Sequence, residues 1–231
     1  MTVSVHTGLT ESGKSWNVLH RVLPLWEKKV VYDIACCFTG DIVLVDPNDK
    51  KLTEIFMKYA RISNYTIVIR PSRTTNEEIL FNKVVQLACA LGRVIGTKDP
   101  AKRVQFVCDE SDFICSPNYQ SRDLKHVVNK GRHDNVDSHF ICRNPMRLHT
   151  DIRANCSKIV TFALKNAQKI DFFREMFGDD NVKLISNLPK YHRMEANEKG
   201  EVSIYDENNR IVGGIQSNSR KIKPENGGIL K

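Results

Sequence analysis

The stretch that decides the fold is Val3-Ser-Val-His-Thr-Gly-Leu-Thr-Glu-Ser-Gly-Lys-Ser15, a short run rich in β-branched residues followed by the pattern G-x-x-x-x-G-K-S. The run predicts a strand. Apolar residues at helical spacing from Trp16 to Leu25 predict a helix that begins directly after the G-x-x-x-x-G-K-S pattern. A glycine-rich loop between a strand and a helix presents backbone amides to phosphate oxygens. We therefore predict a phosphate-binding loop.

Each residue type in the loop has a chemical reason. Gly8 and Gly13 permit the backbone angles and the close approach that a phosphate needs. Lys14 can reach the β- and γ-phosphates, and the Ser15 hydroxyl can ligate Mg²⁺. A chance glycine-rich turn is the alternative, and a second motif further along the chain argues against it. The predicted nucleotide contacts are Gly8, Leu9, Thr10, Glu11, Ser12, Gly13, Lys14, Ser15 and Trp16.

The second motif is Val104-Gln-Phe-Val-Cys-Asp-Glu110, an apolar strand that ends in two acids. Ligands bind at the carboxyl ends of the strands in open α/β sheets, so this strand would deliver Asp109 to the phosphate site. Asp109 is then a candidate for the Mg²⁺ shell, and Glu110 for the group that polarises an attacking water. An acid pair alone is weak evidence, but together with the phosphate loop it predicts nucleotide hydrolysis.

The length and the charge set further bounds. The 231 residues suit one large α/β domain, predicted over 1–195, followed by a polar, basic segment over 196–231. In that segment Val202–Tyr205 and Arg210–Val212 flank a polar turn, which predicts a hairpin before a basic tail over 216–231. The formal net charge of +8 favours a polyanionic partner, although charge alone does not separate DNA, RNA and simple solubility.

The cysteines and the apolar runs predict a compartment. The seven cysteines form no C-x-x-C pair, which favours a reducing cytosol. Cys89, Cys108 and Cys142 lie in apolar runs and are expected in the core, and Cys36 and Cys37 are expected to be packing residues. No run approaches the ~18 apolar residues of a membrane span, and we expect no signal peptide.

The rest of the chain alternates strand and helix patterns, which predicts a mostly parallel sheet flanked by helices. Residues 30–37 could be a strand or a buried turn, and we expect Trp16, Phe172, Phe173 and Phe177 in the core rather than as base-stacking platforms. Further strands are predicted within 41–48 as a buried strand, and at 65–70, 138–145, 158–163 and 182–185. Further helices are predicted at 52–60, 76–91 with Gly92 as the end, 120–130 and 170–177.

Several motifs together resemble the FtsK-HerA superfamily of P-loop ATPases. They are the phosphate loop, the Asp109-Glu110 strand end, Gly131-Arg132 before a strand that ends Arg143-Asn144-Pro145, and the segment Ile152 to Phe162. The compact chain looks most like the genome-packaging ATPases of tailless icosahedral viruses with an internal membrane, over roughly residues 1–190.

The resemblance implies more than the residues do by themselves. It implies a RecA-like P-loop NTPase core, ATP and Mg²⁺ as cofactors, and a homo-oligomeric ring, either a hexamer or a pentamer. It further implies translocation of double-stranded DNA into a preformed capsid, with a viral capsid or membrane vertex protein as a partner. The location would be the cytoplasm of the infected host cell or the virion.

The resemblance also suggests roles for basic residues. We expect Arg132 to reach a neighbouring subunit's nucleotide and Arg143 to lie near the γ-phosphate of its own subunit, with Lys14 and Glu110 completing the catalytic set. Lys125, Lys130 and Arg132 are the candidates for DNA contact, against the alternative of a solvated helix face. The family usually has a polar sensor where Arg143 stands and, in relatives, an arginine where Lys158 stands.

Other functions are weighed against this one. A related ATPase of phage morphogenesis, extrusion or conjugation is the first alternative, and a non-hydrolysing scaffold with the same core is another. A small-molecule P-loop kinase is disfavoured by Glu110 and by the lack of an arginine-rich lid. A GTPase is disfavoured because Thr97-Lys98-Asp99 lacks the spacer of a guanine reader. A metal cluster of His133, Asp134, Asp137 and His139 is disfavoured because no cysteine joins it at zinc spacing.

Overall fold

The computed structural model describes residues 2–72, 75–97, 99–119, 121–165 and 172–216. The predicted basic tail, including the cluster at 220–223, lies outside these residues, as do the first residues of the helix predicted from Ile170.

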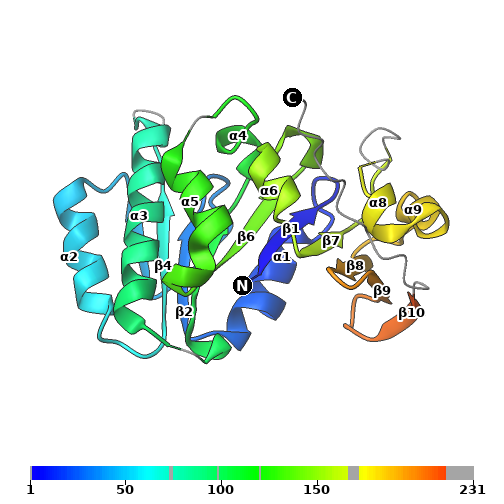
Figure 1. Cartoon of the computed structure of the whole chain (residues 1–231), viewed down its shortest axis with the longest axis horizontal. Coiled ribbons are helices and arrows are strands. Elements are labelled where there is room, and N and C mark those ends of the chain that lie inside the picture. Colours follow the sequence, from blue (N-terminus) through cyan, green and yellow to red (C-terminus); the bar gives the residue numbers. More distant parts are fainter. Residues whose placement is uncertain (1, 73–74, 98, 120, 166–171, 217–231) are drawn as a thin grey trace, which may run out of the picture.

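The centre of the molecule is a ten-stranded sheet in the order β10-β9-β8-β7-β1-β6-β5-β2-β4-β3 (Figure 1). The seven strands β1 to β7 pair in parallel, and β8, β9 and β10 extend the sheet with antiparallel pairing. The predicted fold class, a mostly parallel sheet flanked by helices, is confirmed. The strands are β1 Val3–Thr7, β2 Lys28–Tyr32, β3 Ile42–Val45, β4 Tyr65–Arg70, β5 Val104–Cys108, β6 Val136–Cys142, β7 Lys158–Thr161, β8 Arg193–Asn197, β9 Glu201–Tyr205 and β10 Ile211–Gln216.

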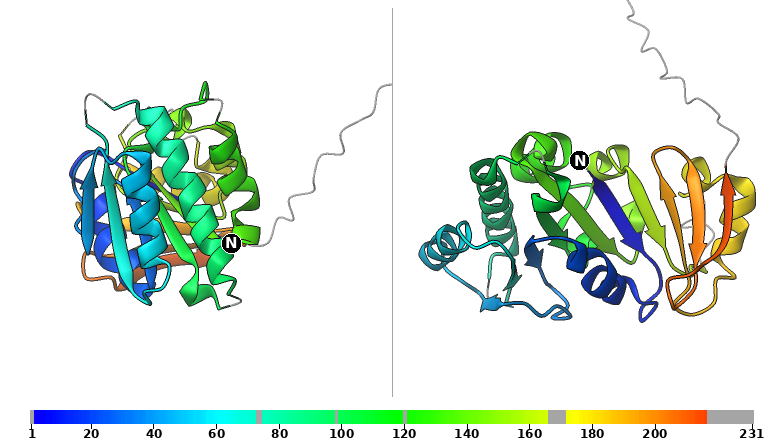
Figure 2. Two further views of the ribbon diagram at one scale, coloured as in Figure 1. Left: turned by 90° about the vertical axis from the view of Figure 1, so that its left-hand side faces the viewer. Right: turned by 90° about the horizontal axis from the view of Figure 1, so that it is seen from below.

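Helices cover both faces of the parallel part of the sheet. Helices α2, α3, α5 and α6 lie on one face (Figure 1), and the helix that begins with α1 lies on the other (Figure 2, right panel). The α-helices are α1 Lys14–Asn17, α2 Asp49–Tyr59, α3 Glu77–Ile95, α4 Ser111–Ile114, α5 Arg122–Lys130, α6 Thr150–Ala154, α8 Arg174–Phe177 and α9 Asp179–Ile185. Directly after α1, η1 Val18–Val22 is a π-helical segment. The 3₁₀-helices are η2 Leu23–Leu25, η3 Pro100–Lys102, η4 Gly131–Asp134 and η5 Pro145–Arg147.

The central strands β1, β2, β5 and β6 bury both of their faces, and successive side chains point to opposite sides of the sheet. Val30 and Phe106 belong to the core beneath α3 and α5, whereas Val31 and Val107 pack with Val18 beneath α1. This explains why the sequence shows continuous apolar runs rather than alternation in the central strands. A separate cluster, which includes Phe173 and Phe177, covers the β7–β8–β9 end.

Two predicted elements differ in detail. Ile42–Val45 was expected to be a buried strand, but β3 is the edge strand beside β4, and Val45 is 64% exposed. Helix α3 does not end at Gly92. A Cβ on Gly92 would lie 1.9 Å from the carbonyl oxygen of Asp134, so this glycine lets η4 pack against the helix. The helix ends at Gly96, which has φ 54°.

The C-terminal part of the described chain departs furthest from expectation. Residues 182–185, predicted as a strand, form the end of helix α9, and strand β8 was not predicted. The predicted hairpin is confirmed as the antiparallel pair β9–β10. Residue 195, where the predicted ATPase domain ends, lies inside β8, so the hairpin continues the same sheet.

Exposure corrects three further expectations and confirms others. Trp16 is not in the core, because it is 53% exposed, and Cys36 and Cys37 are also exposed. Phe173 and Phe177 are buried as expected, as are the predicted core thiols Cys89, Cys108 and Cys142. Within the described ranges, no helix combines the length and the apolar character needed to cross a membrane.

Candidate nucleotide site

The predicted site residues meet at one edge of the sheet. The phosphate loop follows β1, the Asp109-Glu110 pair follows β5, and Arg143 follows β6, which lies between those two strands. Because the three strands are parallel, their carboxyl ends lie together. The sheet therefore brings together four of the residues predicted for chemistry, Lys14, Asp109, Glu110 and Arg143.

The phosphate loop is closed on itself around a buried lysine. Lys14 donates hydrogen bonds from Nζ to the carbonyl oxygens of Gly8 and Leu9, at 3.2 and 2.8 Å. Burial lowers the pKa of Lys14, and the nearby charge of Glu110 opposes that shift. Gly13 has φ 102°, a conformation that favours glycine, and a Cβ on Gly8 would lie 2.7 Å from Cβ of Phe162. Both glycines of the motif are thus required by geometry.

The loop and the acid pair offer oxygen ligands. Ser15 donates from Oγ to Oδ1 of Asp109 at 3.3 Å, while Asp109 Oδ2 and Glu110 Oε2 are buried with no hydrogen-bond partner among the described residues. Burial raises the pKa of Asp109 to about 6, and the charges of Glu110 and Asp33 act in the same direction. A hard divalent cation requires oxygen ligands, and Asp109 has one carboxylate oxygen without a partner beside the Ser15 hydroxyl, so Ser15 and Asp109 fit Mg²⁺.

Glu110 is held in place by an arginine. Nε and Nη2 of Arg143 both donate to Oε1 of Glu110, and the Arg143 backbone amide donates to Asp112 Oδ1 at 3.3 Å. The side-chain hydrogen bonds to Glu110, together with the charge of Glu110, raise the pKa of the Arg143 guanidinium. Glu110 itself has φ 47°, a left-handed conformation that is uncommon for glutamate and that recurs at functional sites.

A cavity of about 720 Å³ opens at this edge and reaches beyond the predicted residues. Tyr191, Arg21, Glu207 and Asn208 line it but were not predicted. Arg21 lies on η1, just after the loop, but no motif marks it. Tyr191, Glu207 and Asn208 lie far from the loop in sequence, and they approach it because β8 pairs with β7. The full lining is Thr10, Glu11, Gly13, Lys14, Ser15, Trp16, Asn17, Arg21, Ala35, Cys37, Glu110, Arg143, Phe162, Tyr191, Glu207 and Asn208.

The residues predicted to bind DNA lie elsewhere. Lys125 and Lys130 are on α5, and Arg132 is on η4, directly before β6. The seven residues of β6 span roughly 20 Å. Arg132 precedes the amino end of β6, whereas its own subunit's phosphate loop lies at the carboxyl ends of the strands, so the two are on opposite sides of the sheet's length. Lys158, where relatives have an arginine, forms an ion pair with Glu195 at 2.7 Å.

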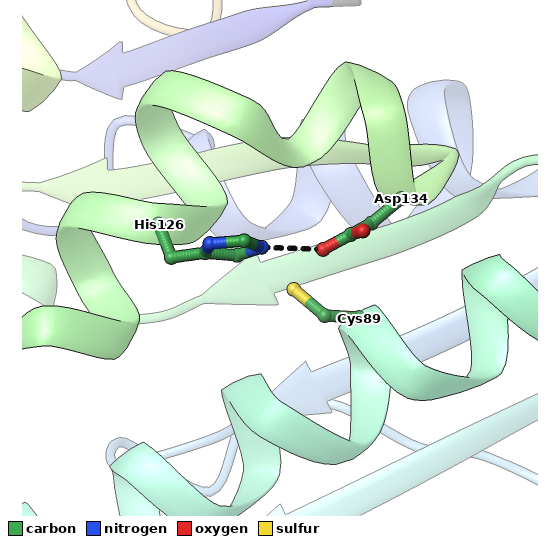
Figure 3. Close-up of side chains that lie close together, drawn as sticks. All are labelled: Cys89, His126 and Asp134. Atoms are coloured by element: carbon green, nitrogen blue, oxygen red, sulfur yellow. Dashed lines mark hydrogen bonds and ion pairs between the residues drawn. The ribbon is translucent and has the colours of Figure 1, made fainter.

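Cys89, His126 and Asp134 form a second cluster on α3, α5 and η4, as Figure 3 shows. Nε2 of His126 lies 2.6 Å from Oδ2 of Asp134, and Arg93 donates to the same oxygen at 2.9 Å. The guanidinium already neutralises the carboxylate that a metal would need, so we interpret the cluster as a hydrogen-bonded tie between helices. His139, from the metal group weighed in the sequence, is bonded to Ser4 and Gln105 instead.

Comparisons with known proteins give likenesses in fold. No family model matches the chain, and no curated protein matches it. The genome packaging NTPase B204 from Sulfolobus turreted icosahedral virus 2, in complex with AMPPCP, has a TM-score of 0.69 at 13% identity, over 88% of this chain and 96% of that one. B204, described as the DNA-packaging ATPase from Sulfolobus Turreted Icosahedral Virus, has a TM-score of 0.67 at 14% identity, over 87% and 95%.

A third likeness is to a larger protein. The pCW3 conjugation coupling protein TcpA, with ATPγS, has a TM-score of 0.50 at 14% identity, over 84% of this chain and 57% of that one. At these identities the likeness concerns the fold. The predicted P-loop NTPase fold is thereby confirmed.

Proposed function

We propose that this chain is an Mg²⁺-dependent ATPase that translocates double-stranded DNA and packages a viral genome into a preformed capsid. The observation that carries the proposal is the convergence of Lys14, Ser15 and Glu110 on one cavity, with Asp109 hydrogen-bonded to Ser15 and Arg143 hydrogen-bonded to Glu110. The likeness in fold to two packaging NTPases supports double-stranded DNA as the polymer that is translocated. The protein would act in the cytoplasm of an infected host cell or in the virion.

The residues divide the chemistry among them. Lys14 exchanges its two loop carbonyls for phosphate oxygens and stabilises the charge that develops on the γ-phosphate. Ser15 and Asp109 would hold Mg²⁺, which neutralises phosphate charge when it is bound. Glu110 orients and polarises the attacking water once its carboxylate is available. Arg143, beside it, can turn from the carboxylate toward the γ-phosphate.

The mechanical step requires neighbours. A homo-oligomeric ring, a hexamer or a pentamer, would carry DNA through its centre, with Lys125, Lys130 and Arg132 as the phosphate contacts. Arg132 lies far from its own phosphate loop, which is compatible with a role at a neighbouring subunit's nucleotide. A capsid or membrane vertex protein would be the docking partner.

Phosphate release from ATP, measured with and without duplex DNA, tests the proposal. The wild-type protein should hydrolyse ATP only with Mg²⁺, and faster with DNA. Lys14→Ala should lose nucleotide binding, and Glu110→Gln should bind ATP but turn it over slowly, because Glu110 acts mainly on the water. Near-normal turnover in Glu110→Gln would refute the assignment of the base.

A further inference from the structure

The cavity at the phosphate loop is lined by residues of two kinds. Lys14, Ser15 and Glu110 are those from which phosphate chemistry is expected. Trp16 and Tyr191 also line the cavity, together with a polar turn from the β9–β10 hairpin. A nucleotide held by its phosphates must place its sugar and base in the remaining space, so these other lining residues are the candidates for contact with a base.

Two exposed aromatic residues face that space. Trp16 is 53% exposed and Tyr191 is 46% exposed, although both line the cavity. The guanidinium carbon of Arg21 lies 4.9 Å from the centre of the Trp16 ring, so the two side chains form a cation–π pair. Aromatic rings and guanidinium planes are the surfaces on which nucleic acid bases stack.

Tyr191 is positioned by its backbone rather than by burial. Its φ of 66° is uncommon for a tyrosine, and the turn that carries it is closed by a hydrogen bond from the His192 amide to the Pro189 carbonyl oxygen at 3.1 Å. A Cβ on Gly13 would lie 3.3 Å from Cδ1 of Tyr191. The ring therefore rests directly against the end of the phosphate loop, and strained conformations of this kind cluster at ligand sites.

The polar turn at residues 206–209 is held by hydrogen bonds within the turn and by hydrogen bonds from Arg21 and Arg193. Within it, Asp206 Oδ1 accepts from the amides of Asn208 and Arg210 at 3.0 and 2.8 Å. Asn209 Oδ1 accepts from Arg193 at 2.5 Å and from Arg21 at 3.4 Å, and Arg21 also donates to the Glu207 carbonyl oxygen. The turn is thus a fixed wall of the cavity, with Asn208 on its lining.

We propose that the part of the cavity lined by Trp16, Tyr191 and the hairpin turn is an adenine site. The base stacks on Tyr191 and against the Trp16–Arg21 pair, and the Asn208 side chain reads its edge. An asparagine amide can accept from the 6-amino group and donate to N7 of adenine, a pairing that guanine does not offer. The inference rests on the proposed nucleotide binding and makes the C-terminal hairpin a part of the nucleotide site.

Calorimetric titration with ATP and with inorganic tripolyphosphate, both with Mg²⁺, tests the site. Tyr191→Ala should weaken ATP binding roughly 5- to 100-fold, the cost of one lost base stack, and leave the affinity for tripolyphosphate unchanged. Tyr191→Phe keeps the ring and should restore most of the ATP affinity. Asn208→Ala should reduce the preference for ATP over GTP.

Comparison of ATP with tripolyphosphate distinguishes a base site that lies elsewhere from a failure of the proposed nucleotide binding. If Tyr191→Ala binds ATP as tightly as the wild type does, the base lies elsewhere and the inference is overturned, while phosphate binding stands. If the variant loses ATP and tripolyphosphate equally, Tyr191 supports the loop rather than the base, and the inference is again overturned. If the wild type binds neither ligand, the proposed nucleotide binding itself fails.

Discussion

Arg143 and Glu110, which follow neighbouring strands, are joined by two hydrogen bonds to a single carboxylate oxygen. Nε and Nη2 of Arg143 lie 3.0 and 2.7 Å from Oε1 of Glu110. A carboxylate paired in this way is oriented, but the guanidinium occupies its Oε1 oxygen. The pairing suits a resting state in which the γ-phosphate would draw Arg143 away and release Glu110.

Arg143→Ala should therefore lower kcat for ATP hydrolysis by about 100-fold, the usual cost of one group that stabilises transition-state charge. Arg143→Lys should also be slow, because lysine lacks the fork that contacts two groups at once. The affinity for ATP should change much less, since Lys14 remains in place. Arg147→Ala, an exposed arginine on η5 that does not line the cavity, is the matched control. Turnover within twofold of the wild type in both Arg143 variants would contradict this role.

Arg132 is predicted to act on the nucleotide of a neighbouring subunit. Arg132→Ala and Glu110→Gln should each be nearly inactive, because an arginine supplied in trans commonly contributes ~10³-fold or more of the rate. When the two variants are mixed, some interfaces join an intact Glu110 to an intact Arg132, and phosphate release should recover. If the variants demonstrably assemble together and activity does not return, Arg132 has no role in trans.

DNA binding should be independent of sequence and should fall steeply with salt, because the candidate contacts are lysine and arginine side chains to phosphates. Replacing Lys125, Lys130 and Arg132 with alanine should reduce the slope of log affinity against log salt by about 2 to 3. The measurement is fluorescence anisotropy with a labelled duplex over a salt series. Alanine at Lys50, Lys51 and Lys58 on α2 is the control, and an unchanged slope in the first variant would place the DNA contacts elsewhere.

Acid should weaken the fold partly through His139. Burial lowers the pKa of His139 to about 4, from an ordinary value near 6.5, as does the charge of Lys158, whereas Asp137 opposes the shift. Between about pH 6.5 and pH 4, His139 is protonated in the unfolded chain but stays neutral in the folded chain. The free energy of unfolding therefore falls as the pH drops through this range. Urea unfolding of the wild type should lose on the order of 3 kcal/mol more over this window than unfolding of His139→Gln. Parallel losses in both proteins would contradict the assignment.

The sequence predicted which candidate site residues lie together, because those residues belong to local motifs. Lys14 and Ser15 lie in one loop, Asp109 and Glu110 end one apolar strand, and parallel strands bring such ends to one edge. Fold class followed from the same alternation of strands and helices. None of these inferences needed a contact between distant segments that only packing could establish.

The parts that sequence reasoning missed depend on such contacts. Trp16 fits the apolar pattern of its helix, yet it is 53% exposed and lines the cavity. Tyr191 reaches the phosphate loop through the antiparallel strand β8, which carries Arg193 and Glu195 and lacks a continuous apolar run. Gly92 looked like a helix end, but its role is the close approach of η4.

Displacement of a third strand annealed to a duplex measures directly whether ATP hydrolysis at Glu110 moves the protein along double-stranded DNA. The wild-type protein should release the third strand only with ATP and Mg²⁺, at a rate that grows with the length of duplex on which the motor can load. Glu110→Gln should bind the same duplex and release nothing. ATP hydrolysis by the assembled protein on this substrate without release of the third strand would contradict this movement along DNA.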